Sequence, residues 1–533
     1  MRKINWLLFA CGILTLACNQ TRTSSVADTS GNLYDSSYEA ATFNDPDRLQ
    51  KIKSTAKIVD SLYKAVAIAN HFPGIAYGVM VDGQMVYTGA YGFTDVDKKI
   101  PVTSSSVFRI ASMSKSFTAM AILKLRDEGK LQLDDPAEKY VPAMKKLKYP
   151  TRDAARITIR QLLTHGAGFP EDNPWGDRQL ADSDKELVEL IEKQVSFSTT
   201  PNSSYEYSNL GFALLGRIVT EVSGKPYQQY IKESIWEPLG MKSSEWEYAN
   251  VPADKLAHGY RWLNEKWNEE TLLHDKADGS WGAMGGMMTS IDDFGNYMAL
   301  HLSAWPASNA AEKGPIKRSS IREMHYPWRV NGANPNYKYT DGRVCPIISS
   351  YCYGLGWVKD CDGKVYIAHS GGLPGFGSQW RIMPDYGIGV VAFANRTYAG
   401  VGGVNMQVLD TLVKLAGLKP RELPPSKILE KRKTELVSLL PDWNNAEKSG
   451  IFAENFFPDY PIDTLKKYAR ELYTKAGKVI SVQKVKPDNL LRGSFIIEGE
   501  KADIQIYFTL SPENPALIQE YHINEAPKAQ PKK

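Results

Sequence analysis

The sequence has few of the residues and patterns that mark metal-dependent or nucleotide-dependent chemistry. It holds five cysteines and eight histidines in 533 residues. It contains no His-Glu-x-x-His segment and no clustered His/Asp set, which argues against a metal-dependent hydrolase. The pairs Gly285-Gly286 and Gly371-Gly372 lack the spacing of a phosphate-binding loop, and neither internal repeats nor heptad runs occur. We therefore expect chemistry that needs no cofactor and no metal.

The chain also has no large excess of positive or negative charge. The chain has 64 Lys and Arg against 60 Asp and Glu, a formal net charge of +4. Removal of a leader containing Arg2 and Lys3 would leave a net charge of +2. Nucleic-acid-binding domains carry a much stronger basic patch, so no nucleic-acid partner is expected.

Long hydrophobic runs are absent except for a short one at the N-terminus. Residues 6–16 are mostly apolar and follow Arg2 and Lys3, a pattern typical of an export signal and too short to span a bilayer. The run ends at Leu-Thr-Leu-Ala-Cys, which resembles a bacterial lipoprotein cleavage site with Cys18 as the lipid-bearing residue, although Thr15 departs from the usual aliphatic residue. A plain secretory signal is the alternative. We expect an exported protein, lipid-anchored in a bacterial cell envelope on its periplasmic or outer-membrane side.

Beyond residue 18 the cysteines are Cys345, Cys352 and Cys361 only. An odd number in an exported protein allows one disulfide and leaves one thiol. Their clustering favours a local disulfide, and the sequence does not say which two of the three are paired. Metal binding is the weaker alternative, because the spacing matches no common zinc pattern.

One short motif predicts nucleophilic chemistry. Ser112 is followed three residues later by Lys115, and apolar residues recur at helical spacing over 117–125, up to Gly129. On a helix this spacing puts the hydroxyl and the amine on one face. An amine kept neutral by burial could take the serine proton. Ser-x-x-Lys alone is a weak signal, since it recurs elsewhere in the chain and a serine at a helix start is most often an N-cap.

Two further motifs strengthen the prediction because they follow in order. They are Tyr207-Ser208-Asn209, just before a predicted helix over 210–222, and His369-Ser370-Gly371-Gly372, at the end of a predicted strand. Tyr207 read alone could be a core tyrosine. The three elements together predict a covalent serine hydrolase.

With these motifs, residues 56–415 resemble the serine β-lactamase-like proteins. This family includes class C β-lactamases, D-alanyl-D-alanine carboxypeptidases, D-aminopeptidases and related esterases. Collinear segments that also match are Leu162–Gly168, Gly224–Tyr227, Pro238–Met241 and Gly285–Ser290. Predicted strands at both ends of this region, with helices between them, agree with the family's α+β fold. We expect an antiparallel β-lactamase/transpeptidase-like sheet flanked by helices, with an inserted helical region.

The resemblance implies roles for the motif residues. Ser112 matches the nucleophile, Lys115 the lysine that activates it, and Tyr207 the tyrosine that shuttles a proton to the leaving group. Which of Lys115 and Tyr207 is the base in acylation stays open. Asn209 matches a hydrogen-bonding group for Lys115 or for the substrate amide.

The late motif lies where the family binds substrate. Gly371 and Gly372 match the strand segment at the oxyanion, with the N–H of Gly372 joining that of Ser112. His369 stands where many β-lactamases have a lysine, and an imidazole charged only part of the time would hold a carboxylate less firmly. His165, in the Leu162–Gly168 segment, is expected to be structural.

The expected partner is therefore a small D-amino-acid peptide of peptidoglycan type, or a small ester. A β-lactamase proper is one alternative. A non-catalytic envelope protein that binds peptides or peptidoglycan is another, against which the presence of Ser112, Lys115 and Tyr207 argues.

Composition divides the chain into five regions. We predict a signal peptide over 1–18, a polar tether over 19–55, the hydrolase domain over 56–418, a Pro-rich and charged linker over 419–442, and a small α+β accessory domain with a disordered tail over 443–533. The sequence leaves the oligomeric state open.

Overall fold

The computed structural model describes residues 37–271 and 279–527. Cys18 and the rest of the predicted signal peptide lie outside the described residues, as does the predicted C-terminal tail from Lys528. Within the described ranges, no helix is both long enough and apolar enough to cross a membrane.

The core of the protein is a nine-stranded antiparallel sheet built from both ends of the hydrolase region, in the order β3-β2-β1-β13-β12-β11-β10-β9-β8. The early strands are β1 (Gly74–Val81), β2 (Gln84–Asp95) and β3 (Ile100–Pro101). The late strands are β8 (Arg329–Asn334), β9 (Ile347–Tyr351), β10 (Gly356–Asp360), β11 (Val365–Leu373), β12 (Phe376–Met383) and β13 (Ile388–Ala394). The predicted antiparallel sheet is confirmed, and β1 closes it by pairing with β13.

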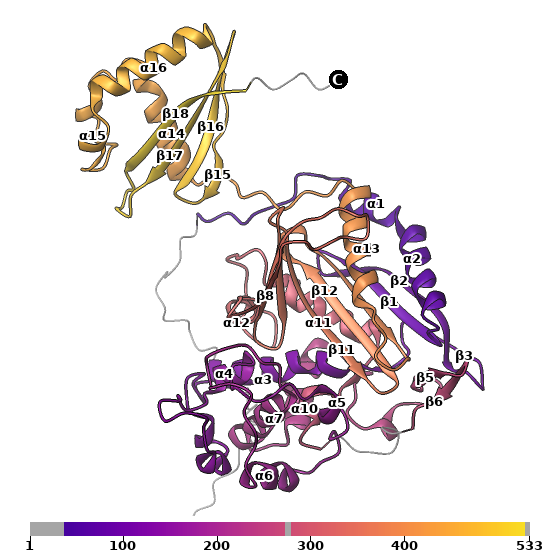
Figure 1. The fold of residues 1–533 in the computed structure, drawn as a ribbon. Coiled ribbons are helices and arrows are strands. Elements are labelled where there is room, and N and C mark those ends of the chain that lie inside the picture. Colours follow the sequence, from indigo (N-terminus) through magenta and orange to yellow (C-terminus); the bar gives the residue numbers. More distant parts are fainter. Residues whose placement is uncertain (1–36, 272–278, 528–533) are drawn as a thin grey trace, which may run out of the picture. The chain divides into compact units, whose positions relative to one another are not determined.

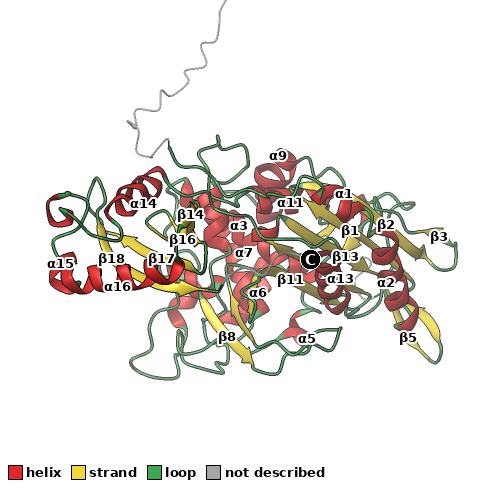
Figure 2. Ribbon diagram, turned by 90° about the horizontal axis from the view of Figure 1, so that it is seen from above, coloured by secondary structure: helices red, strands yellow, loops and turns green. Residues whose placement is uncertain are grey.

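Side chains alternate between two buried faces of this sheet. On β1, Ile75 and Tyr77 belong to one apolar cluster, whereas Ala76 and Met80 belong to another. The first cluster packs against α2 (Ala56–Ala69) and α13 (Gly402–Leu415), and the second faces α11 (Ile291–Ser303). Figure 2 shows the sheet between α11 on one side and α2 and α13 on the other.

A helical region inserted between the two sets of strands carries most of the site. Its helices are α3 (Ser114–Asp127), α4 (Ile159–Leu163), α5 (Asn173–Gly176), α6 (Asp184–Glu192), α7 (Asn209–Ser223), α8 (Tyr227–Ile231), α9 (Glu237–Leu239), α10 (Gly282–Gly285), α11 and α12 (Arg318–Met324). Two-stranded pairs join β4 (Phe108–Arg109) to β7 (Met288–Thr289) and β5 (Tyr260–Leu263) to β6 (Lys266–Glu269). In Figure 1 the helices α3, α4, α6, α7 and α10 gather beside one end of the sheet.

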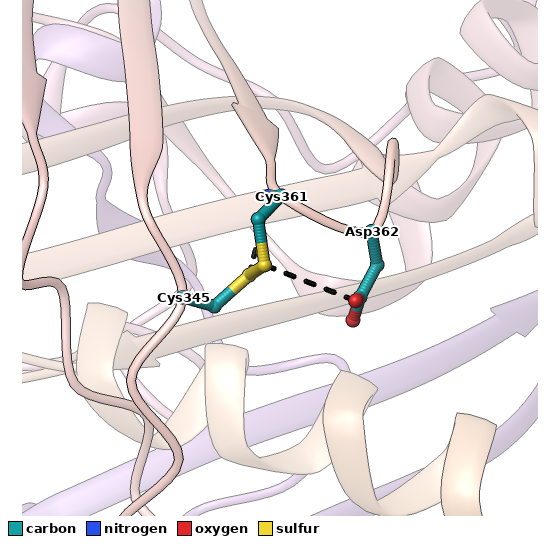
Figure 3. Close-up of side chains that lie close together, drawn as sticks. All are labelled: Cys345, Cys361 and Asp362. Carbon is teal, nitrogen blue, oxygen red and sulfur yellow. Dashed lines mark hydrogen bonds between the residues drawn. A yellow bond between two sulfur atoms is a disulfide. The ribbon is translucent and has the colours of Figure 1, made fainter.

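The structure fixes the cysteine pairing that the sequence left open. Cys345 and Cys361 form a disulfide, and Cys352 is a buried free thiol. Among the described residues, these two sulfurs and the Asp362 carboxylate are the one group close enough to share a metal ion. Figure 3 shows the joined sulfurs with the carboxylate beside them. Sulfurs bonded to each other cannot be thiolate ligands, so the structure favours the disulfide over the metal site.

Two regions at the borders of the hydrolase domain are more structured than their composition predicts. The range predicted as tether contains α1 (Arg48–Lys53), and Thr42 forms a β-bridge with Glu422. The range predicted as linker contains α14 (Lys427–Leu439), whose Leu429 and Leu436 lie in the core of the C-terminal part.

The C-terminal part is a small α+β unit, as predicted. It holds α14, α15 (Phe456–Asp459) and α16 (Ile462–Ala476) with β14 (Val479–Val482), β15 (Lys486–Asn489), β16 (Arg492–Gly499), β17 (Asp503–Leu510) and β18 (Ile518–Ala526). The strands form one antiparallel sheet in the order β14-β16-β17-β18, with β15 also paired to β16.

Candidate active site

Ser112 lies in the short helical turn η1 (Ala111–Met113) that leads into α3. The sheet holds this turn closely, because the Ser378 hydroxyl on β12 donates to the carbonyl of Ile110 at 2.7 Å. On β11, a Cβ at Gly371 would come within 2.1 Å of that same carbonyl oxygen. Gly371 is therefore needed for the close approach of β11 to the turn that carries Ser112.

Lys115 lies on the first turn of α3 with its side chain fully buried. Its Nζ donates to Ser112 Oγ at 3.0 Å, to Asn209 Oδ1 at 2.7 Å and to the carbonyl of Met284 at 2.8 Å. These acceptors come from three separate helices or turns, so the amine is held in one place beside the serine hydroxyl.

The charge of Lys115 is set mainly by burial. Loss of water around the ammonium lowers the pKa of Lys115 to about 7, although the carboxylates of Asp172 and Asp177 act in the opposite direction. A lysine with this pKa is uncharged in a large share of molecules near neutral pH. It can therefore accept the proton of Ser112.

Tyr207 precedes α7, where a capping network fixes the backbone. The Asp172 carboxylate accepts from the backbone N–H of Asn209 at 2.6 Å and of Leu210 at 2.9 Å, and so binds the positive end of the helix. The side chain of Ser208 is the N-cap. Tyr207 is thus placed just outside the start of the helix, as the sequence predicts.

The Tyr207 hydroxyl shares a hydrogen bond with the side chain of Ser112, and Lys115 Nζ lies 5.0 Å from the centre of its ring. Burial raises the pKa of Tyr207 well above its usual value. The side chain is therefore a neutral phenol, which can donate or relay a proton but is a poor base in its resting state.

His369 on β11 differs from its predicted state. Its Nδ1 lies 2.6 Å from the carbonyl of Ser370, and its Nε2 lies 2.9 Å from the hydroxyl of Tyr351. Burial, together with the nearby Lys115, lowers the pKa of His369 to about 3. The prediction of a partly charged imidazole is wrong, because burial removes most of the water around the ring and the positive charge of the nearby Lys115 disfavours a second one.

This neutral state fixes the proton on His369. A carbonyl oxygen faces Nδ1, so Nδ1 carries the hydrogen and donates it to Ser370. Nε2 then accepts the hydrogen of the Tyr351 hydroxyl. His369 anchors a tyrosine rather than offering a positive charge to a substrate.

His165 has a supporting position. Its Nδ1 accepts the backbone N–H of Ser208 at 3.1 Å, and its ring centre lies 4.2 Å from that of Tyr207 and 4.3 Å from that of Tyr351. Burial lowers the pKa of His165 well below its usual value. The neutral ring holds the loop that presents Tyr207.

These groups open into a cavity of about 560 Å³ that runs along β11. Ser112, Tyr207, His369, Gly371 and Gly372 all line it. Gly372 faces the ring of Tyr398, which an added Cβ would approach to 2.9 Å. The cavity therefore brings the predicted nucleophile and the predicted oxyanion strand to the same wall.

The comparisons with known proteins agree with this geometry. A family model described as Beta-lactamase matches residues 57–413, well over half of the chain. The chain belongs to the β-lactamase family.

Curated relatives of low sequence identity match most of this region. Protein flp of Staphylococcus aureus (strain MW2) is 29% identical over 346 residues, which cover 63% of this chain and 62% of that protein. The match therefore spans less than two thirds of the length of that relative.

Solved structures support the fold. The octameric penicillin-binding protein homologue from Pyrococcus abyssi aligns with a TM-score of 0.55 and 23% identity, over 86% of this chain and 94% of that one. A D-stereospecific amidohydrolase from Streptomyces sp. aligns with a TM-score of 0.52 and 24% identity, over 67% of this chain and 98% of that one.

In this β-lactamase-family site, the structure brings together every predicted residue that it describes. Ser112, Lys115, Tyr207 and Asn209 are linked by hydrogen bonds, and His369, Gly371 and Gly372 lie on the facing strand.

Several residues of the cavity were not predicted from the sequence. They come from segments read as loops or as plain strands, and they are Asn173, Asp177, Tyr351, Gln379, Arg381 and Tyr398. Asp177 is buried, and loss of water raises its pKa to about 6, while the hydroxyl of Tyr398 donates to it at 3.0 Å. No spacing in the sequence links these residues, because the fold alone brings them together.

Proposed function

We propose that the protein is a serine hydrolase that cleaves amide or ester bonds through an acyl-enzyme on Ser112. The observation that carries this proposal is the contact of 3.0 Å between Lys115 Nζ and Ser112 Oγ, made by a fully buried lysine whose pKa is lowered to about 7. A serine beside a partly neutral amine is an activated nucleophile.

In the acylation step, Ser112 Oγ attacks the substrate carbonyl while Lys115 takes the hydroxyl proton. The backbone N–H groups of Ser112 and Gly372 stabilise the oxyanion. Tyr207 donates its phenol proton to the leaving nitrogen or oxygen and recovers one from the protonated Lys115. The bond from the carbonyl carbon to the leaving group breaks, which leaves an ester on Ser112. A water molecule then hydrolyses this ester by the reverse proton path.

We assign the acylation base to Lys115 rather than to Tyr207. Burial lowers the pKa of the lysine towards neutrality but raises that of the tyrosine well above its usual value. The lysine is therefore the group that offers a free electron pair at neutral pH.

The substrates we propose are D-amino-acid peptides of peptidoglycan type, or small esters. Neutral His369 supports this choice, because it lacks the positive charge that the lysine of many β-lactamases offers. The similarity to a D-stereospecific amidohydrolase points in the same direction. We further propose a lipid anchor at Cys18 and a place in the bacterial cell envelope, on the strength of the N-terminal sequence alone.

Labelling and a substrate screen test the proposal. A fluorophosphonate should give one adduct, on the peptide that contains Ser112, and Ser112→Ala should give none. Hydrolysis of D-alanyl peptides and short esters should be unaffected by a chelator. An adduct on another residue would contradict the mechanism, and faster turnover of a cephalosporin than of every peptide and ester would contradict the substrate class.

A further inference from the structure

The active-site cavity continues past Ser112 onto the opposite face of the sheet. On β12, Ser378 and Trp380 point to the face of η1 and α11, whereas Gln379 and Arg381 point to the face of α13. The cavity is lined by residues of both faces, since it contains Ser112 as well as Arg381. It can do so because β10 pairs with β11 only as far as Ala368, so the edge of β11 beyond this residue is open.

Arg381 is a cation without an anion. Among the described residues, no carboxylate pairs with it, and its one hydrogen bond, of 3.3 Å, runs from Nη1 to the weak acceptor Met406 Sδ. Its Nε is buried and makes no hydrogen bond within the described chain. The guanidinium carbon lies 5.6 Å from the ring centre of Tyr366. An arginine remains charged under all ordinary conditions, and a partly buried charge without a partner is costly.

Space for an anion lies beside this guanidinium. Arg381 sits opposite Ala368 on β11, which in turn sits opposite Gly356 on β10, and both small residues line the cavity. The N-terminus of α13 lines the same part of the cavity through Val401 and Gly402. In the described structure no side chain caps this helix end, so its positive pole faces the space as well.

Neighbouring polar groups complete the lining. Gln379 Nε2 donates to Ser370 Oγ at 3.0 Å, while its buried Oε1 has no partner in the described residues. Gln379 lies directly against Gly402, where an added Cβ would come within 2.7 Å of Nε2. These groups can orient a polar ligand, while the charge comes from Arg381.

The position along β11 defines how far this region is from the bond that is cleaved. The turn carrying Ser112 packs at Gly371, three residues along the strand from Ala368. At the rise of an extended strand this is roughly 10 Å. Contacts to Tyr366 and Met406 keep the guanidinium away from Gly371 rather than close to it.

We propose that Arg381 and the N-terminus of α13 bind a substrate carboxylate that lies at least one residue away from the scissile bond. The proposal rests on the serine-hydrolase function and narrows its substrate class. The substrate would extend along the open edge of β11 as an added strand, with its carboxylate reaching the guanidinium. Arginine can bind a carboxylate with two parallel hydrogen bonds, which lysine cannot reproduce.

Matched substrate pairs test this proposal. Each pair has the same scissile D-alanyl bond and differs in one group on the adjoining residue, a carboxylate or a carboxamide. One pair carries that group on the acyl side and the other on the leaving side. The variants are Arg381→Met, Arg381→Lys and the surface control Arg156→Met, with a small uncharged ester as the reference substrate.

For wild type and for Arg156→Met, the carboxylate substrate of one of the two pairs should exceed the matching carboxamide in kcat/KM by roughly 10- to 100-fold. This is the range of a charge-assisted hydrogen-bonded pair. Arg381→Met should remove this preference through KM, and it should lower kcat/KM on the acid at least about tenfold more than on the reference ester. Arg381→Lys should restore only part of it.

An unchanged acid preference in Arg381→Met, or no preference in wild type, would overturn the subsite. An equal loss on acid, amide and ester would show a merely structural arginine and would overturn it too. If wild type hydrolyses no substrate, the proposed function fails instead. The subsite is then tested by competition, in which the acid but not the amide should slow fluorophosphonate labelling of wild type.

Discussion

The assignment of Lys115 as the base predicts a specific pH dependence of acylation. The pKa of Lys115 is about 7, so the neutral amine is roughly half populated at pH 7 and falls about tenfold for each pH unit below that. Acylation should rise with pH through 7 and level off above about pH 8. At pH 5 it should be on the order of one hundredth of the plateau.

A charge change near Lys115 should move this profile in a known direction. The Asp177 carboxylate raises the pKa of Lys115, so Asp177→Asn should lower that pKa and shift the rise in activity to lower pH. The pKa of Asp177 itself is about 6, so most of its charge is present at pH 7 and can be removed by the substitution. Asp153→Asn, at an exposed loop position, is the control and should leave the midpoint unchanged.

The assay is the rate of fluorophosphonate labelling of Ser112, combined with kcat/KM on an uncharged ester between pH 5 and 9. An uncharged substrate keeps its own titration out of the profile. A flat profile from pH 5 to 8, or a midpoint near the ordinary lysine value, would refute the assignment of Lys115. A shift of the Asp177→Asn midpoint to higher pH would refute the electrostatic reasoning.

Four further predictions follow from the same site and from the chain's organisation. Tyr207→Phe should lower kcat by about 10²–10⁴-fold with little change in KM, because it removes a proton relay; stopped-flow and steady-state assays on one ester check this. Lys115→Met should gain stability relative to wild type near pH 7, because its folded-state pKa lies below the unfolded value of about 10.5 and burial of its charged form costs free energy. That gain should shrink by about 1.4 kcal/mol for each pH unit between the folded-state pKa of about 7 and the unfolded-state value of about 10.5, as urea unfolding at several pH values would show. A chain that stops after Pro425 should keep its ester hydrolysis, since α14 packs with the C-terminal core; a complete loss of activity would contradict this separation. Cys18→Ser should release a soluble form from membranes, and an equally soluble wild type would favour plain secretion.

Local signals in the sequence predicted the elements that depend on neighbouring residues. The Asp82-Gly83 pair is a typical two-residue hairpin sequence. It forms the turn between β1 and β2, where both residues have positive φ. The apolar spacing over 462–476 likewise indicates a helix, and the structure has α16 with these bounds. In both cases the turn residues or the apolar spacing lie within the element, so no distant contact is needed.

The strands β8 and β9 were not predicted, because β8 has no alternating apolar pattern and the pairing of the two strands is non-local. On β8, all six residues from Arg329 to Asn334 are at least partly exposed, and five of them are polar or small. The strand therefore has no buried alternating face. The pair is held by the sheet edge at β10 rather than by a strong strand pattern. No strand over 313–350 is predicted from the sequence, so the strand that presents Tyr351 is not anticipated.

The residues of the site also fall into those whose contact the sequence predicts and those that only the fold brings together. The spacing of Ser112 and Lys115 is local, so the sequence predicts their contact. Asp177 and Arg381 reach the cavity only because α5 and β12 converge on β11, and no spacing along the chain encodes that convergence.

The neutral state of His369 depends on its burial and on the charge of the nearby Lys115, neither of which can be derived from the sequence. Lys115 and His369 occupy one buried region, where each positive charge disfavours the other. Desolvation lowers both pKa values. The pKa of Lys115 starts from a much higher ordinary value and falls to about 7, whereas the pKa of His369 falls to about 3. In the mechanism we propose, the proton taken from Ser112 is therefore held by Lys115 and not by His369. If Lys115 is the cation that serves proton transfer, a substrate anion needs another positive group. The unpaired guanidinium of Arg381 on β12, opposite Ala368 of β11, is the group that we propose for this role.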